Sequence, residues 1–417
     1  MSWMIAALPR DGWLLFITRF VRLFAYGFLS VVLVLYLNAV GLSDDRVGLL
    51  LTLTLVGDIG VSLWVTTRAD RAGRRRMLAV GAALMLAAAA VFAGTAYFWL
   101  LLLAATIGVI SPSGNEVGPF LPIEQAALTQ LIPANSRTRI LAWYNLTGSL
   151  ATALGSLAGG AALQMLQGSG WEGAESFRPI VVGYGALGIV LAVLFAILSP
   201  ATEVPSATAH QPAGSRWGLH RSRGIVLRLS ALFALDAFGG GFVMQSVVAW
   251  WFHERFRTPP ALIGAIFFGA NILAGISALA AAWVARHVGL INTMVFTHLP
   301  SNLLLILVPL MPDQAWAIAV MLLRFSISQM DVPARQSYTL AVVAPEERSA
   351  ASGVTGVARS VGAAFAPQLA MLLFARPAWL SVPFFLAGGV KILYDLLLWQ
   401  RFRSLKPLEE QIPSGPT

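Results

Sequence analysis

Twelve ionisable side chains lie inside the long apolar stretches of this sequence, where a charge is costly and therefore marks a candidate functional position. The basic residues are Arg19, Arg22, Arg324, Arg335, Arg359 and Lys391, and the acidic residues are Asp58, Glu116, Glu124, Asp236, Asp331 and Asp395. Because the signs balance, these groups either neutralise one another in ion pairs or leave some members free to contact a solute or carry a proton. Both interpretations stay open for each residue.

The stretch 315–343 has the clearest constellation of polar groups. Its polar residues are Arg324, Ser328, Asp331 and Arg335. On one continuous helix, their spacing of i, i+4, i+7 and i+11 would put all four on the same face. Such a face cannot contact lipid, and we expect it to line a central cavity. A pair between Asp331 and Arg335 would satisfy itself and leave Arg324 in need of a partner.

The stretch 98–131 is too long for one straight membrane helix, and segment 111–119 interrupts it with two prolines and two glycines. Non-helical backbone at membrane depth is tolerated only where it is buried in protein or lines a cavity. If the interruption lies there, Asn115 and Glu116 are candidate contacts for a substrate or a proton. The alternative is a short span ending at residue 110, with the interruption in a loop outside the membrane.

Two further acids have informative surroundings. Asp58 lies about three helical turns before the next basic loop, which places it near mid-membrane at about 1.5 Å per residue. Burial there would suit it to carry a proton, unless Arg19 or Arg22 holds it ionised. Asp236 precedes the glycines at 239–241, which should weaken the helix and allow a bend used in gating.

The composition indicates a protein that crosses a membrane many times. Of 417 residues, 57% are hydrophobic and 11% are charged, whereas soluble domains have about 25% charged residues. Each span needs about 20 apolar residues, and twelve such stretches are present. They are 13–37, 47–67, 77–95, 98–131, 140–165, 180–198, 225–252, 261–285, 293–310, 315–343, 351–374 and 381–399. There is no cysteine, which excludes disulfides and thiolate metal ligands.

The loops between these spans predict the orientation and the domains. Assigning loops alternately puts seventeen basic residues on the side of both termini and five on the other, so we expect both termini in the cytoplasm. The net charge of +9 reflects this bias and gives no sign of nucleic-acid binding. We expect a six-helix bundle at 1–198, a cytoplasmic linker at 199–224, a second bundle at 225–400 and a cytoplasmic tail at 401–417.

The two halves repeat one short pattern. Pro-Ile-Glu-Gln at 122–125 and Pro-Ala-Arg-Gln at 333–336 are 211 residues apart, each late in the fourth span of its half. Weak internal symmetry is typical of transporters built from two related halves. Glu124 and Arg335 occupy equivalent positions with opposite charge, and we hypothesise that they pair when one side closes. Alternatively, Asp331 already neutralises Arg335.

A basic loop at 66–76 joins the second and third spans. It resembles the signature of the major facilitator superfamily, G-x-x-x-D-R-x-G-R-R/K. Asp70, Arg71, Gly73, Arg74 and Arg75 match it, whereas Thr66 replaces the leading glycine. The resemblance implies twelve transmembrane helices, transport by alternating access, and a loop that braces the two halves in one of the alternating states.

We therefore expect an all-α membrane protein with twelve transmembrane helices in two pseudo-symmetric six-helix bundles. The expected function is secondary active transport of a small molecule, with proton-coupled export favoured. One alternative is an anion transporter that uses Arg19, Arg22 and Arg324, and another is a transport-inactive sensor on the same scaffold. We expect a monomer in the cell (inner) membrane, whose partners are the substrate, protons and lipid. No motif of an enzyme, cofactor or metal site is present.

Overall fold

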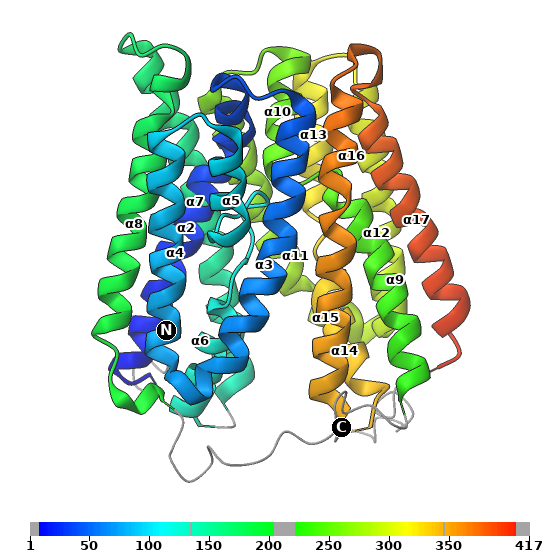
Figure 1. Cartoon of the computed structure of the whole chain (residues 1–417). Helices are drawn as coiled ribbons and strands as arrows, with labels where there is room; N and C mark the ends of the chain where they lie inside the picture. Colours follow the sequence, from blue (N-terminus) through cyan, green and yellow to red (C-terminus); the bar gives the residue numbers. More distant parts are fainter. Residues whose placement is uncertain (1–7, 134–135, 204–221, 345–346, 406–417) are drawn as a thin grey trace. The chain divides into compact units, whose positions relative to one another are not determined.

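A computed structural model describes residues 8–133, 136–203, 222–344 and 347–405, except for the side chains of Asp70, Arg71, Thr138 and Ser349. In this part of the chain every regular element is a helix (Figure 1). The first half contains α2 (Arg10–Ala39), α3 (Asp44–Ala72), α4 (Arg74–Gly94), α5 (Phe98–Ile107), α6 (Phe120–Leu131), α7 (Arg137–Gly168) and α8 (Arg178–Ala196).

The second half contains nine α-helices among the described residues. They are α9 (Arg223–Gly241), α10 (Gln245–Phe256), α11 (Pro260–Val288), α12 (Leu290–Leu307), α13 (Gln314–Phe325), α14 (Asp331–Ala341), α15 (Arg348–Ala364), α16 (Ala366–Phe374) and α17 (Val382–Phe402). Short 3₁₀ helices join some of the elements: η2 (Gly173–Ser176), η3 (Pro200–Thr202), η4 (Val308–Leu310) and η6 (Pro377–Trp379).

The described residues form twelve membrane spans. Among the described residues, ten helical segments are long and apolar enough to cross a membrane. The shorter apolar helices α5 and α13, continued by α6 and α14, supply the fourth and tenth spans. The predicted all-α membrane architecture is confirmed. The expectation of one continuous helix at 315–343 is wrong, because α13 ends at Phe325 and α14 begins at Asp331.

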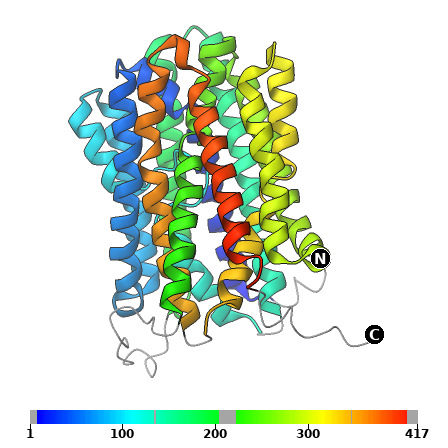
Figure 2. The same cartoon turned by 90° about the vertical axis from the view of Figure 1, so that its right-hand side faces the viewer.

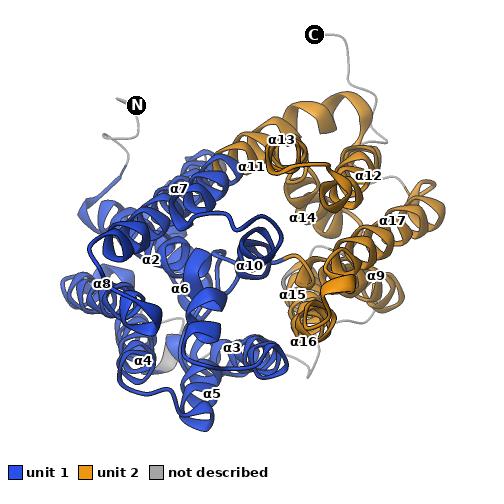
Figure 3. Cartoon of the chain, turned by 90° about the horizontal axis from the view of Figure 1, so that it is seen from above, with its two compact units in different colours: residues 1–211, 244–271 blue, residues 212–243, 272–417 orange. Residues whose placement is uncertain are grey.

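The chain divides into two compact units (Figure 3). Unit 1 comprises residues 1–211 and 244–271, and unit 2 comprises residues 212–243 and 272–417. Among the described helices, α2 to α8, α10 and the first part of α11 therefore belong to unit 1. Helix α9, the rest of α11, and α12 to α17 belong to unit 2.

In unit 1, α2 packs closely against α7 because α7 presents glycines to it. A Cβ atom on Gly155 would collide with the backbone of Phe24, and one on Gly159 would collide with the backbone of Phe28. Small residues of this kind let membrane helices approach closely. The contact fixes the polar residues of α2 beside those of α7.

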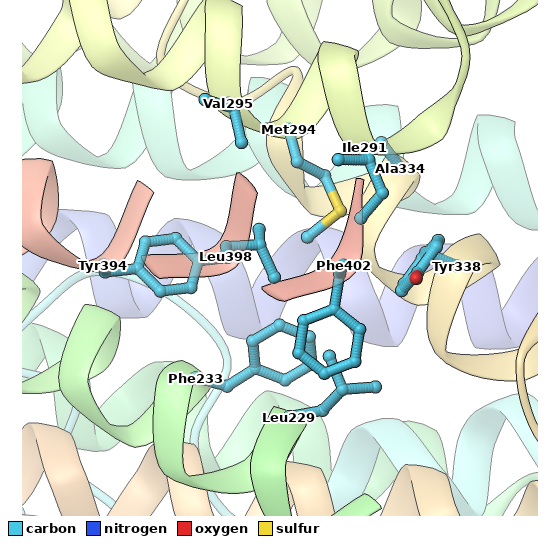
Figure 4. Packing of buried hydrophobic residues seen from close by; sticks show 10 residues of the cluster. All are labelled: Leu229, Phe233, Ile291, Met294, Val295, Ala334, Tyr338, Tyr394, Leu398 and Phe402. Atoms are coloured by element: carbon cyan, nitrogen blue, oxygen red, sulfur yellow. The ribbon is translucent and has the colours of Figure 1, made fainter. Parts of the chain in front are cut away.

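In unit 2, a buried apolar cluster joins α9, α12, α14 and α17 (Figure 4). Its members are Leu229, Phe233, Ile291, Met294, Val295, Ala334, Tyr338, Tyr394, Leu398 and Phe402. Figure 2 shows α17, in red, running beside α9, in green. Charged and polar residues of the same four helices lie within about one turn of cluster members. The apolar packing therefore sets the positions from which those polar groups meet.

Candidate functional site

Three ion pairs join four mid-span charged residues of unit 1. The Arg22 guanidinium lies 2.7 Å from the Glu124 carboxylate and 3.1 Å from that of Glu116. Arg19 lies 2.5 Å from Glu116 and donates a hydrogen bond of 3.3 Å to the side chain of Asn145. Two bases and two acids thus neutralise one another, and neither arginine is left free.

Glu124 is the most enclosed member of this group. It is fully buried, and so is Arg22. The Thr18 hydroxyl donates to one carboxylate oxygen at 2.8 Å, and the Tyr144 hydroxyl donates to the other at 2.5 Å. A buried carboxylate with a cation and two hydroxyl donors is well satisfied. These contacts of Glu124 hold α6 against α2 and α7.

The interruption in the fourth span lies inside unit 1. The Tyr26 hydroxyl donates to the carbonyl of Val117 at 3.2 Å, and the Thr152 hydroxyl donates to the carbonyl of Gly114 at 3.1 Å. Tyr26 and Thr152 lie near the middle of α2 and α7, respectively. Hydroxyl groups from other helices thus replace missing helical hydrogen bonds, as buried backbone requires. The alternative of a loop outside the membrane is wrong.

The two candidate contacts within the interruption differ in their surroundings. Asn115 is exposed, and its backbone carbonyl accepts a hydrogen bond from the Ser111 hydroxyl at 2.7 Å. Glu116 is partly exposed, with 20% of its side chain accessible, and is held by Arg19 and Arg22. Of the two, only Glu116 is tied into the charge network.

Asp58 lies at the middle of α3 and touches the same interruption. Its Oδ1 atom accepts the backbone N–H of Gly118 at 2.5 Å and the hydroxyl of Ser62 at 3.3 Å. Among the described residues, no basic side chain lies within 4 Å of Asp58, so neither Arg19 nor Arg22 neutralises it. It is a mid-span carboxyl held by one backbone N–H group and one serine hydroxyl.

In unit 2, Asp236 on α9 is the centre of a charge network. Its carboxylate lies 2.6 Å from the Lys391 ammonium on α17. It also lies 3.1 Å from Arg359 on α15 and 3.3 Å from Arg335 on α14. Arg335 in turn lies 2.7 Å from Asp331, so the local pair predicted from the sequence is confirmed. The glycines after Asp236 end α9, and α10 begins at Gln245, so the predicted bend is a helix break.

A histidine extends this network in a way that sequence reasoning missed. The Nδ1 atom of His298 lies 2.8 Å from Asp395, and its Nε2 atom lies 3.8 Å from Asp236. The Asn302 amide donates to Asp395 at 2.9 Å. The sequence does contain a signal for this network. Polar residues are four positions apart on two otherwise apolar helices, at 298 and 302 and at 391 and 395, so each pair lies on one helix face.

Arg324 stands apart from this network. It stacks on the Phe325 ring at 5.0 Å. In the described part of the chain, its Nε atom has no hydrogen-bond partner and no carboxylate lies within ion-pair distance. The Ser328 hydroxyl, one turn later, also has no partner there.

The basic loop is held by an acid that the motif does not include. Gly73 joins α3 to α4 with φ of +100°, which favours glycine. The Glu203 carboxylate accepts the backbone N–H groups of Arg74 at 2.6 Å and Arg75 at 3.2 Å. It therefore caps α4 and complements the helix dipole. The side chains of the motif residues Asp70 and Arg71 lie outside the described residues.

The fourth span of each half breaks at an equivalent place. Helix α6 begins two residues before Pro122, and α14 begins two residues before Pro333. A proline in the first turn has no N–H to lose and favours a helix start there. Paired interruptions in related halves indicate the binding region of a transporter.

The fold and this arrangement agree with known families. The model of the Major Facilitator Superfamily matches residues 15–367. The chain belongs to the major facilitator superfamily. This superfamily member is 29% identical, over 93% of each chain, to the Saccharomyces cerevisiae protein named uncharacterized membrane protein YJR124C. It is therefore a multi-pass membrane protein of a family that moves small molecules by secondary transport.

Solved structures share the superfamily fold. The nucleoside transporter NupG has a TM-score of 0.73 at 12% identity, covering 95% of this chain and 100% of that chain. The xylose transporter XylE from E. coli has a TM-score of 0.70 at 15% identity, covering 98% of this chain and 100% of that chain. A bacterial homolog of the human lysosomal transporter Spinster has a TM-score of 0.69 at 16% identity, covering 93% of this chain and 94% of that chain. At these identities the likeness shows the fold.

Proposed function

We propose that this superfamily member is a proton-coupled exporter of a small molecule and that Asp58 carries the proton. The observation behind the proposal is its lack of a counter-ion. The five other mid-span acids of the described part each lie beside a basic group: Glu116, Glu124, Asp236, Asp331 and Asp395. A carboxyl that can gain or lose a proton without breaking an ion pair is best suited to couple proton movement to transport.

Protonation of Asp58 changes the bond that ties α3 to the interruption. A neutral carboxyl is a weaker acceptor than a carboxylate, so proton uptake loosens the Gly118 contact. Glu116 is two residues away and joins Arg19 and Arg22. Proton binding at Asp58 thereby biases the arrangement of the unit 1 charge network, which is the two-state element that coupling needs.

The alternative of an anion transporter using three arginines gains only partial support. Arg19 and Arg22 are neutralised by Glu116 and Glu124. Arg324, by contrast, has no carboxylate within ion-pair distance among the described residues. If the cargo is an anion, the geometry favours Arg324 over the other two as its contact.

We further propose that the protein lies in the cell (inner) membrane with both termini on the cytoplasmic side. We also propose that the loop with Asp70, Arg71, Gly73, Arg74 and Arg75 acts as the conformational gate. The excess of basic residues in the loops on the side of both termini supports the orientation. The cap that Glu203 forms on α4 supports an ordered loop.

The test is flux in proteoliposomes. Purified protein is first screened by ligand-dependent thermal unfolding against organic anions, sugars and lipophilic cations. A compound that stabilises the protein is then placed either inside or outside proteoliposomes across which a pH gradient is imposed. We expect uphill movement in exchange for protons and its loss when an ionophore collapses the gradient. Accumulation that survives the ionophore would overturn proton coupling, and binding without any flux would instead identify a sensor.

A further inference from the structure

Unit 2 contains one mid-span base without a counter-ion in the described part of the chain. Three other bases, Arg335, Arg359 and Lys391, all contact Asp236. Among the described residues, Arg324 has no carboxylate within 4 Å, and its Nε–H group is shielded from solvent and donates to no partner. Leaving a charge-bearing donor buried and unsatisfied is unfavourable.

A second unsatisfied group lies one turn away. The Ser328 N–H donates to the Arg324 carbonyl at 3.0 Å, which places the two side chains one helical turn apart on the same side. Ser328 is 4% exposed, and its hydroxyl has no partner among the described residues. The next backbone donor, that of Gln329, is satisfied by the Ser277 hydroxyl at 3.3 Å. The buried donors without a partner are therefore the Nε–H group of Arg324 and the hydroxyl of Ser328.

The nearby acids are already engaged. Asp331 contacts Arg335 at 2.7 Å, and Asp236 is held by the three other bases. Leaving His298 aside, the described mid-span ionisable residues of unit 2 are four bases (Arg324, Arg335, Arg359, Lys391) and three acids (Asp236, Asp331, Asp395). One bound monoanion would bring these charges to parity.

We propose that Arg324 and Ser328 bind the carboxylate of an anionic substrate, an inference that rests on the proposed transport function. The planar guanidinium presents Nε and a neighbouring Nη as a fork that matches the two oxygens of a carboxylate. The Ser328 hydroxyl adds a third donor. The position beside the break between α13 and α14 agrees with a substrate site at the interrupted helices.

The experiment compares carboxylates with their neutral isosteres. Thermal unfolding of the purified full chain is measured with benzoate and benzamide, succinate and succinamide, and inorganic phosphate. We expect at least one carboxylate to raise the unfolding temperature while its amide does not. Stabilisation by phosphate alone, or equal stabilisation by acid and amide, would overturn the assignment of a carboxylate.

Variants locate the site. Arg324→Gln should weaken carboxylate binding about 100-fold, and Ser328→Ala about tenfold, as expected for hydrogen bonds to a charged group. Arg376→Gln is the matched control, because Arg376 is exposed and stacks on Trp379. Without ligand, Arg324→Gln should unfold at the same or a higher temperature, because it removes a partly buried charge that has no counter-ion among the described residues. Unchanged carboxylate affinity in Arg324→Gln would refute the site.

The two proposals fail in different ways. Carboxylate binding that depends on Arg324, without flux, would retain this site and reject transport. Proton-coupled flux of uncharged compounds only would retain transport and reject this site.

Discussion

The backbone N–H of Gly118 donates to the Asp58 carboxylate at 2.5 Å, and this bond joins the interruption of the fourth span to the middle of α3. Two segments that are 60 residues apart in the sequence are thereby linked through one acceptor atom, Oδ1 of Asp58. Asp58 is also the one mid-span acid of the described part without a basic partner. The state of one carboxyl is therefore linked directly to non-helical backbone within the bundle.

Asp58→Asn should separate proton coupling from exchange. The amide oxygen can still accept the Gly118 N–H, so we expect the protein to fold, but the side chain can no longer carry a proton. Exchange of substrate across vesicles should persist, whereas accumulation driven by a pH gradient should be lost. Ser62→Ala is the control, because it removes only the longer 3.3 Å bond to Asp58. Gradient-driven accumulation in Asp58→Asn would rule out this residue as the carrier.

Arg22→Met should destabilise unit 1 strongly. It leaves the buried Glu124 carboxylate without its cation, and breaking a buried pair from one side costs about 3–5 kcal/mol. Adding Glu124→Gln should recover part of that loss. The measurement is thermal unfolding in detergent for both single variants and the double variant.

A matched control for the buried pair exists on the surface of the same unit. Arg178 and Glu175 lie 2.7 Å apart, with 48% and 57% of their side chains exposed. Arg178→Met should hardly change the unfolding temperature, because exposed pairs contribute little. Strictly additive losses in the Arg22 and Glu124 double variant would show that the two residues stabilise the unit independently.

Gly239 and Gly240 should respond differently to alanine. A Cβ atom on Gly239 would lie 2.9 Å from the Lys391 Cγ atom and 3.1 Å from the Ala387 carbonyl, which are too close. On Gly240 the nearest atom of Lys391 would be 3.7 Å away, an ordinary contact. We expect Gly239→Ala to lower the unfolding temperature by displacing Lys391 from Asp236. Gly240→Ala should be neutral or slightly stabilising, because alanine favours helix by about 1 kcal/mol over glycine.

The same pair of variants tests the glycines as a hinge. If flexibility at 239–241 serves gating, Gly240→Ala should slow flux although it leaves the protein stable. Flux equal to that of the unmodified protein would restrict the role of these glycines to close packing against α17.

Glu203→Ala should loosen the start of α4. Loss of a side-chain acceptor at a helix N-terminus costs about 0.5–2 kcal/mol, and here two backbone donors, those of Arg74 and Arg75, lose their acceptor. We expect faster hydrogen exchange in the first turn of α4, measured by mass spectrometry, with the middle of the helix unchanged. Glu203→Gln keeps one amide oxygen and should show an intermediate effect. Equal exchange in all three proteins would contradict a capping role.

Local chemistry determined the number and type of the elements. Span length follows from the apolar run needed to cross the bilayer. The interruption at 111–119 was visible because proline and glycine disfavour a regular helix. The pair between Asp331 and Arg335 was also predictable, since its members are four residues apart on one turn of helix.

Only the tertiary structure decided which distant charges meet. Asp236 on α9 contacts bases from α14, α15 and α17, and these contacts depend on how the four helices are rotated about their axes as they pack. The break before α14 was likewise missed, because segment 326–330 contains neither proline nor glycine. Arg324 differs from the other described mid-span bases because no described carboxylate lies within ion-pair distance of it, and the sequence cannot show such an absence. Ion pairing acts through space over a few ångströms, whereas sequence patterns report only neighbours along the chain.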